Sequence, residues 1–231
     1  AWDKERGSKR VAGILQDALV TAASAGQEKI VKTLLGRTEV DFGDLTGIRG
    51  LSSLASAARK NHEAVVKLLL QDPRIQPDAA SENSPTLLTF AIWGAHEAIV
   101  RLLAGRADVD VNARDTEGRT PISHAAAETH QGIMKFLLGD QTIQVDLADS
   151  QLRTPLMYAA AHGYDRNVRL LLERQDVDPN RRDNCGCTAL SYAAEAGHET
   201  TIRLLLQRPD VNVGIPDKEG RLPLWYAEKS S

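Results

Sequence analysis

The chain has 231 residues, enough for one or two conventional domains, and its 42% apolar and 26% charged residues are ordinary for a globular protein. A formal net charge of -3 excludes an electrostatic grip of the whole molecule on nucleic-acid phosphates, although a local basic patch remains open. No apolar run approaches 18 residues and no secretory leader pattern is present, so the sequence supports neither membrane insertion nor secretion.

Residues 1–16 form the first predicted segment. They are charged at the start and then apolar at Val11, Ile14 and Leu15, so we expect a helix that caps the repeats that follow. The chain starts with Ala1 and stops shortly after a repeat begins, which suggests part of a larger protein.

From residue 17 onward one pattern returns every 34 or 35 residues, which is the signature of a repeat architecture. Six of the seven unit starts carry a side-chain oxygen suited to capping a helix N-terminus, and proline follows in three units. The sequence therefore predicts a helix start in each unit. The starts are Asp17, Ser52, Thr86, Thr120, Thr154, Thr188 and Leu222.

Each unit continues with a second apolar pattern. An unbroken apolar column follows two residues after each start, as at Leu54 and Leu156, and an alanine column follows three residues later. A further segment carries i, i+4 apolar pairs such as Ile99 and Leu103 on one helical face. Each unit is therefore expected to hold two helices, a turn between them and an extended turn at its end.

The turn residues carry a resemblance to a known family. Asp115, Gly118, Thr120 and Pro121 form one turn and helix start, and Asp183, Gly186 and Thr188 form another; the chain resembles the ankyrin repeat family over roughly residues 17–231. The resemblance implies an all-α ankyrin-repeat solenoid, in which helix-turn-helix units with β-turn fingers stack into a curved superhelix. Six units look complete, and the unit from residue 222 is partial.

Three positions depart from the family pattern. Leu152 stands where glycine is usual, so either it adopts a positive φ at an energetic cost or its finger is reshaped. Residues 81–84 lack both the aspartate and the glycine. Glu228 puts a charge where the other units are apolar, which suits a terminal repeat that faces water.

The titratable residues offer little chemistry. His62, His96, His130 and His198 recur once per unit, too far apart to share a metal ion, and are interpreted as structural. Cys185 and Cys187, the only cysteines, exclude a disulfide framework and favour an intracellular compartment, cytoplasmic or nuclear. We expect two exposed, unpaired thiols; the alternative, a zinc site, lacks a second cysteine pair. No catalytic residue, metal site or cofactor is predicted, because no nucleotide-binding or hydrolase motif occurs.

One column, four residues after each start, concentrates the rings of a chain that has few aromatics. It reads Phe90, His124, Tyr158, Tyr192 and Tyr226 in five successive units. The rings either form an exposed ladder of partner anchors or pack between neighbouring helices; the two interpretations are compatible.

The resemblance implies binding of a protein or peptide through the concave face, made of finger tips and inner helices, without catalysis. Arginines are frequent on the fingers, so an acidic partner is one hypothesis and solvated turn residues are its alternative; nucleic acid is a weaker candidate, and a monomer is expected. A second possible role is a structural or regulatory spacer in a larger signalling protein. The candidate binding residues are Phe90, Trp93, Arg114, Arg119, His124, Arg153, Tyr158, His162, Arg182, Tyr192, Arg221 and Tyr226.

Overall fold

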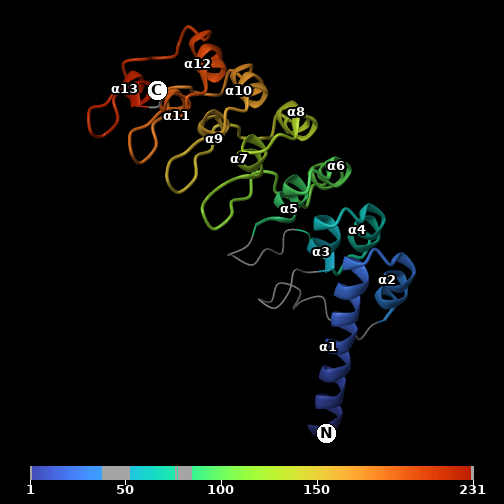
Figure 1. Ribbon diagram of the computed structural model, residues 1–231. Coiled ribbons are helices and arrows are strands. Elements are labelled where there is room, and N and C mark those ends of the chain that lie inside the picture. Colours follow the sequence, from blue (N-terminus) through green and yellow to red (C-terminus); the bar gives the residue numbers. More distant parts are fainter. Residues whose placement is uncertain (1, 38–52, 76, 78–84, 230–231) are drawn as a thin grey trace. The chain divides into compact units, whose positions relative to one another are not determined.

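A computed structural model describes residues 2–37, 53–75, 77 and 85–229, without the side chains of residues 2–9 and 229. The described residues form helices and no strand, which confirms the all-α prediction (Figure 1). The helices are α1 (Trp2–Ser24), α2 (Glu28–Leu35), α3 (Ser53–Arg59), α4 (Glu63–Leu70), α5 (Leu87–Trp93), α6 (Glu97–Ala104), α7 (Pro121–Ala126), α8 (Gln131–Gly139), α9 (Pro155–Ala161), α10 (Asp165–Leu172), α11 (Ala189–Glu195), α12 (Glu199–Leu206) and α13 (Pro223–Lys229).

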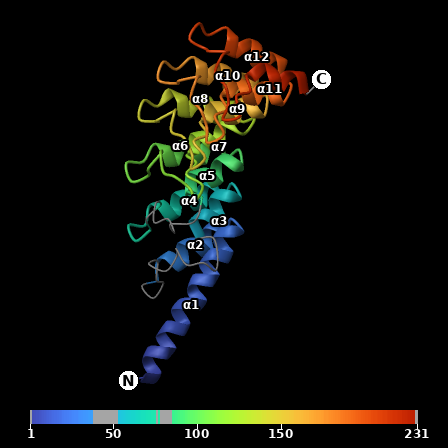
Figure 2. The same cartoon turned by 90° about the vertical axis from the view of Figure 1, so that its left-hand side faces the viewer.

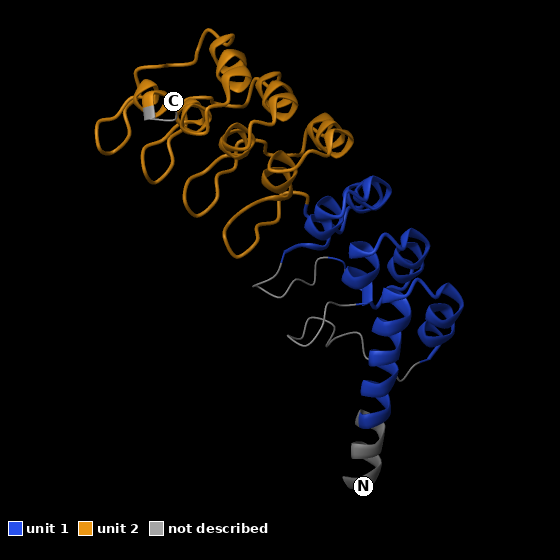
Figure 3. Ribbon diagram, viewed as in Figure 1, with its two compact units in different colours: residues 1–110 blue, residues 111–231 orange. Residues whose placement is uncertain are grey.

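The chain divides into two compact units, residues 1–110 and residues 111–231 (Figure 3). In the first unit, α1, α3 and α5 pack in one row and α2, α4 and α6 in a second. In the second unit, α7, α9, α11 and α13 form one row and α8, α10 and α12 the other (Figure 2). We call the rows first helices and second helices. Helix pairs that stack on their neighbours are the architecture expected from the repeat period.

Helix α1 corrects one prediction. It runs without interruption through Asp17, so Asp17 does not begin a helix. No glycine or proline lies between residues 14 and 24, and an aspartate inside a helix is tolerated. The C-terminal part of α1 instead serves as a first helix, with Leu19 and Ala22 fully or almost fully buried. A domain boundary between residues 16 and 17 stays a prediction.

The other helix starts follow the sequence where they are described. Thr86, Thr120, Thr154 and Thr188 are the N-caps of α5, α7, α9 and α11, and each side-chain oxygen accepts the N–H of the third residue that follows. Each such cap stabilises its helix by about 1 kcal/mol. Ser52 and residues 81–84 lie outside the described residues.

The repeat period places the same residue in the same surroundings. Leu54, Leu88, Ile122 and Leu156 of the predicted apolar column are buried, and so are the alanines three residues later. Leu224 is the exception: its side chain is 69% exposed on α13. Glu228 on the same helix is also exposed, in line with the expected water-facing terminal repeat.

Arginines after the second helices connect neighbouring repeats within each unit. Arg174 pairs with Asp176 and donates to the carbonyl of Leu138, one repeat earlier. Arg208 repeats this arrangement with Asp210 and the carbonyl of Leu172. In the first unit, the corresponding arginine, Arg106, pairs with Asp108 and reaches Leu70. Each guanidinium therefore satisfies a carbonyl at the end of the preceding second helix.

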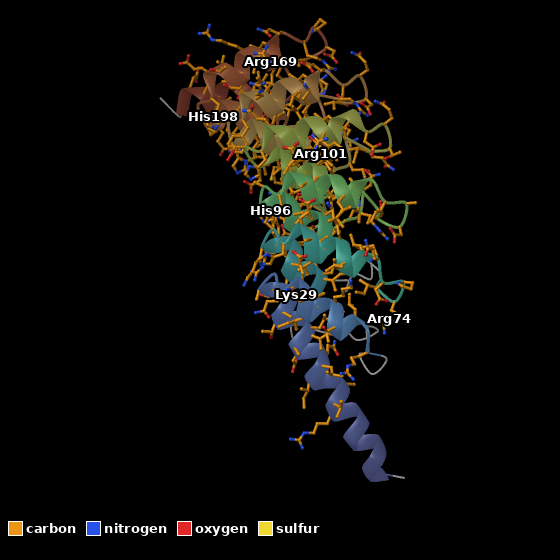
Figure 4. The ribbon with its side chains drawn as sticks, turned by 90° about the vertical axis from the view of Figure 1, so that its right-hand side faces the viewer. Lys29, Arg74, His96, Arg101, Arg169 and His198 are labelled. Atoms are coloured by element: carbon orange, nitrogen blue, oxygen red, sulfur yellow. The ribbon has the colours of Figure 1, made fainter. Side chains whose placement is uncertain are left out.

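Three members of the histidine column are structural in the same sense. The Nε2 atoms of His62, His96 and His198 lie 3.1, 2.9 and 3.2 Å from carbonyl oxygens near the ends of the preceding first helices. Tyr164 stands in this column in the fifth helix pair, α9 and α10, and there Asn167 donates to the carbonyls that close α7 instead. The rings and the amide complete helix ends that would otherwise keep free carbonyls. His96 is labelled in Figure 4.

Candidate functional site

Four loops of the second unit lie beside the first helices, away from the second helices (Figure 1). We call them the first finger (Asp115–Thr120), second finger (Asp149–Thr154), third finger (Asp183–Thr188) and fourth finger (Asp217–Leu222). Each closes with a hydrogen bond from the N–H of its aspartate to the carbonyl four residues later, 2.9 to 3.0 Å long. The fingers are therefore defined turns that present their side chains at fixed positions.

A buried aspartate holds each finger from inside. The Oδ1 atom of Asp149 accepts the N–H groups of Gln151 and Arg153, both at 2.8 Å. Asp115, Asp183 and Asp217 accept the equivalent pairs of N–H groups in their own fingers. Because buried carboxylates must be satisfied by donors, these bonds fix the turn and the aspartate together.

The second oxygen of each aspartate binds the ring column. The hydroxyls of Tyr158, Tyr192 and Tyr226 donate to Asp149, Asp183 and Asp217, each over 2.6 Å. His124 fills the same place, with Nε2 2.9 Å from Asp115 Oδ2. Each of these four rings therefore ties its first helix to the finger that precedes it.

Burial and these bonds set the protonation states. Burial raises the pKa of Asp149, but the hydroxyl of Tyr158 and the N–H and guanidinium of Arg153 outweigh it, so the pKa lies below its usual value. Burial, with the bond to Asp149, raises the pKa of Tyr158, so the hydroxyl stays a donor. Burial lowers the pKa of His124 despite the bond to Asp115, which favours a neutral ring. We call the hydrogen bonds between each finger aspartate and its ring the aspartate clasps. They are structural hydrogen bonds to an ionised carboxylate.

The ring column is not a uniformly exposed ladder. His124 and Tyr226 are buried, 5% and 7% exposed, so the prediction that these two rings are free anchors is wrong. Tyr226 packs against Cys187 and Ala194 of the preceding repeat. Phe90, Tyr158 and Tyr192 are half-buried and keep part of a ring face accessible. For His124 and Tyr226 the packing alternative is the correct one.

The finger arginines are also engaged. Arg119, Arg153 and Arg221 each pair with the buried aspartate of their own finger, at 2.9, 2.9 and 2.6 Å. The Arg153 guanidinium also lies 5.0 Å from the centre of the Tyr158 ring. Their charges are largely neutralised internally, which weakens an acidic-partner hypothesis that rests on these three.

Arg114 and Arg182 differ because they have no carboxylate partner among the contacts described here. Both are exposed. Arg114 donates to the carbonyls of Gly118 and Ala148, and Arg182 to those of Gly186 and Pro216. Each therefore joins two fingers while keeping its positive charge.

Glycines permit this arginine contact. A Cβ on Gly118 would lie 2.8 Å from Ser150 Oγ and 3.4 Å from the Arg114 guanidinium, and a Cβ on Gly186 would lie 2.7 Å from that of Arg182. In the second finger the corresponding pair is Ala148 and Leu152, with no guanidinium to accommodate. Leu152 keeps the turn of the other fingers at φ 62°, so the first of the two predicted outcomes is correct. Such a conformation costs a non-glycine residue about 1 kcal/mol or more.

Two predicted aromatic or heteroaromatic sites are exposed. Trp93 is 42% exposed on α5 and meets Phe90 edge to face, with ring centres 5.7 Å apart. His162 is exposed at the end of α9 and stacks on Tyr164 at 5.4 Å. Trp93 belongs to the first unit and His162 to the second, so each is a site within its own unit.

The cysteines separate into two classes. Cys185 is exposed on the third finger, as expected, whereas Cys187 is buried, so the prediction of an exposed thiol there is wrong. Cys187 occupies the place of the finger arginines and turns inward, packing with Ala194 and Tyr226. Burial raises the pKa of its thiol. Among the described residues, no three His, Cys, Asp or Glu side chains gather as ligands for a metal ion.

Comparison with known proteins gives concordant results. The family model for ankyrin repeats (three copies) matches residues 19–115, 95–183 and 168–231. The crystal structure of the ankyrin repeat domain of Bcl-3, a member of the IkappaB protein family, is similar with a TM-score of 0.76 and 23% identity, covering 91% of this chain and 93% of that one. No curated protein matches the sequence. Within the described residues, no helix has the length and apolar character needed to cross a membrane.

Proposed function

Since this chain belongs to the ankyrin repeat family, whose domains are typical protein-interaction modules and generally non-catalytic, we propose that it binds a protein or peptide partner and performs no reaction. The binding face consists of the finger tips and the exposed sides of the first helices. We place this activity inside the cell, because the sequence has two cysteines and both are free thiols.

The proposal rests on one observation. In the second unit, buried aspartates and backbone hydrogen bonds fix the fingers, while the finger tips remain exposed. The aspartate clasps hold each turn, and backbone bonds join adjacent fingers, from the N–H of Ser150 to Glu117, Asn184 to Gln151 and Lys218 to Cys185. A preorganised surface loses little conformational entropy on binding. Exposed tips on a rigid support are suited to recognition.

Candidate anchors follow from exposure. Trp93 and His162 present accessible rings, and Tyr158 and Tyr192 present partial ones, whereas His124 and Tyr226 act through the support of their fingers. Exposed aromatic side chains supply much of the binding energy in protein interfaces, about 2 kcal/mol or more at a central position.

The test compares two faces of the folded protein. One variant carries His162→Ser at the end of α9 and Lys218→Glu on the fourth finger; the control carries Lys135→Ser and Arg169→Ser, exposed positions on second helices of the same unit (Figure 4 labels Arg169). Proteins captured from native extract are quantified by mass spectrometry. We expect a partner that falls at least tenfold with the first variant and stays with the control.

Loss with the second-helix control but not with the first variant would refute the proposed face. Captured proteins unaffected by both variants would instead favour a spacer role. Thermal unfolding of both variants must match the wild type, so that a loss reports on the surface and not on the fold.

A further inference from the structure

Leu152 is the anomalous position on the finger row. It is 48% exposed and has φ 62°, where the other three fingers have Gly118, Gly186 and Gly220 at φ 77°, 85° and 80°. Glycine adopts this conformation freely, whereas leucine does not. Because a half-exposed apolar side chain in an unfavourable backbone conformation does not stabilise the fold, we look for a role of Leu152 in binding.

The exposed charges on the second and third fingers have one sign. In the second and third fingers the carboxylates, Asp149 and Asp183, are buried and bonded inward. The first and fourth fingers differ, because they expose Glu117 and Glu219. The second and third fingers therefore show water no carboxylate of their own.

The exposed charges at this place are positive. Arg182 is exposed and donates only to backbone carbonyls in the contacts described above, so its charge is not cancelled by a carboxylate. Arg181 beside it is exposed too but pairs with Asp146 at 3.5 Å, and the charge of Arg153 is neutralised by Asp149. Leu152 thus projects from two fingers whose exposed charges are arginines, beside the first finger, where Glu117 pairs with Arg119 at 3.1 Å.

The third finger is tied to the second beside Leu152. Asn184 donates its backbone N–H to the carbonyl of Gln151 over 2.8 Å, and its side chain lies 3.4 Å from the carbonyl of Ser150. The two fingers therefore form one surface, on which Leu152 and the arginines keep fixed relative positions.

We propose that Leu152 is a specificity-determining contact: it receives an extended segment of the partner protein that carries an apolar side chain flanked by carboxylates. This inference deepens the proposed function and rests on it. Leu152 provides the apolar contact. The exposed guanidinium groups of Arg114 and Arg182 lie beside Gly118 and Gly186, the positions equivalent to Leu152 in the preceding and following fingers, and attract the flanking charges. The phosphates of a nucleic acid would pair with the arginines, but they would gain nothing from an apolar contact with Leu152.

The experiment selects displayed random peptides of twelve residues on the whole chain. The dominant peptide is synthesised and its affinity measured by fluorescence anisotropy against the wild type, Leu152→Asn and Leu206→Asn. Asparagine tolerates the left-handed conformation and removes the apolar contact. Leu206 is a matched control, because it is also 48% exposed but lies on a second helix.

We expect selected peptides to share an apolar residue between Asp or Glu residues. Leu152→Asn should weaken binding at least tenfold, Leu206→Asn less than twofold, and replacing the peptide's Glu by Gln at least threefold. Unchanged thermal unfolding of Leu152→Asn establishes that the fold is intact.

Peptides that bind Leu152→Asn as tightly as the wild type, or that lack acidic residues, would overturn this inference. If those peptides bind the variant carrying His162→Ser and Lys218→Glu less tightly than the wild type, the proposed function stands and only the role of Leu152 falls. Selection of no peptide would count against both. Competition by a mixed-sequence DNA duplex in place of acidic peptide would assign the surface to nucleic acid.

Discussion

At the scale of single residues, Asp146 differs from the residues at the equivalent position of the neighbouring repeats. Asn112 and Asn180 each use their amide to donate to a carbonyl and to accept an N–H in the loop that follows the next second helix. Asp146, midway between them in sequence, has no NH2 group to donate, and its buried Oδ1 has no hydrogen-bond partner. Burial raises its pKa to about 6, although Arg181 opposes the rise.

Asp146→Asn should therefore stabilise the protein at neutral pH by about 1 to 3 kcal/mol, because an amide can donate where the carboxylate cannot. A carboxyl whose pKa rises from 3.8 to about 6 on folding favours the folded state only when protonated. The stability of the wild type relative to the variant therefore rises as pH falls from about 6 to about 4. Urea unfolding at pH 4.5 and 7.5 measures the difference.

Asp176→Asn provides a control of opposite sign. Arg174 lowers the pKa of Asp176 through a side-chain hydrogen bond, so removing this charge should not stabilise the protein at pH 7.5. An Asp146→Asn variant that gains no stability at pH 7.5, or gains equally at both pH values, would show that the carboxyl is solvated as in the unfolded chain.

At the scale of elements, two kinds of arginine contact join successive repeats, and both follow the 34-residue period. Arg174 and Arg208 satisfy carbonyls of the preceding second helices. On the fingers, Arg114 and Arg182 reach forward to the next finger, each over a glycine four residues later. The second finger lacks this connection because Ala148 has no guanidinium.

The missing contact can be restored. Ala148→Arg together with Leu152→Gly should stabilise the fold by about 1 to 2 kcal/mol, since it adds hydrogen bonds to two carbonyls and removes the positive φ of a leucine. Ala148→Arg alone should gain less, because the Cβ of Leu152 occupies the space that the guanidinium fills over Gly118 and Gly186. Thermal and urea unfolding of both single variants and the double variant give the coupling energy. A coupling of zero would show that the two positions act independently.

At the scale of the whole molecule, the free energy of folding is distributed over the repeats and the contacts between neighbouring repeats. Each of the two units has its own buried core, and within each unit the repeats contact the repeats next to them. Stability in such arrays is a sum of repeat and interface contributions, and three or more repeats suffice for folding.

Residues 111–231 should therefore fold as a separate fragment. We expect a helical circular dichroism spectrum and a cooperative urea transition, and Leu156→Ala in this fragment should lower its stability by about 2 to 5 kcal/mol, because Leu156 is 1% exposed. A fragment without a cooperative transition would show that its core depends on residues 1–110.

The sequence by itself determined the family, the helix pairs and most helix starts. These depend on interactions between residues close in sequence: a threonine such as Thr154 caps the N–H three residues ahead, and a period of 34 residues returns each leucine to the same face. It also identified the unusual backbone position of Leu152, because the turn requires a positive φ whatever side chain stands there. The R-x-D pattern of the arginines that connect the second helices is equally visible in the sequence.

Only the tertiary structure decided which side chains are free. Tyr158 and Tyr226 share a column and both bond a finger aspartate, yet one is half-exposed and the other buried, because exposure depends on what each neighbouring repeat places against the ring. For the same reason, the sequence did not predict the burial of Cys187 or the pairing of Arg153 with Asp149. The repeat period and the composition predict the type of residue at each position. The charge and the accessible surface that a side chain offers to a partner depend on how the neighbouring repeats pack against it.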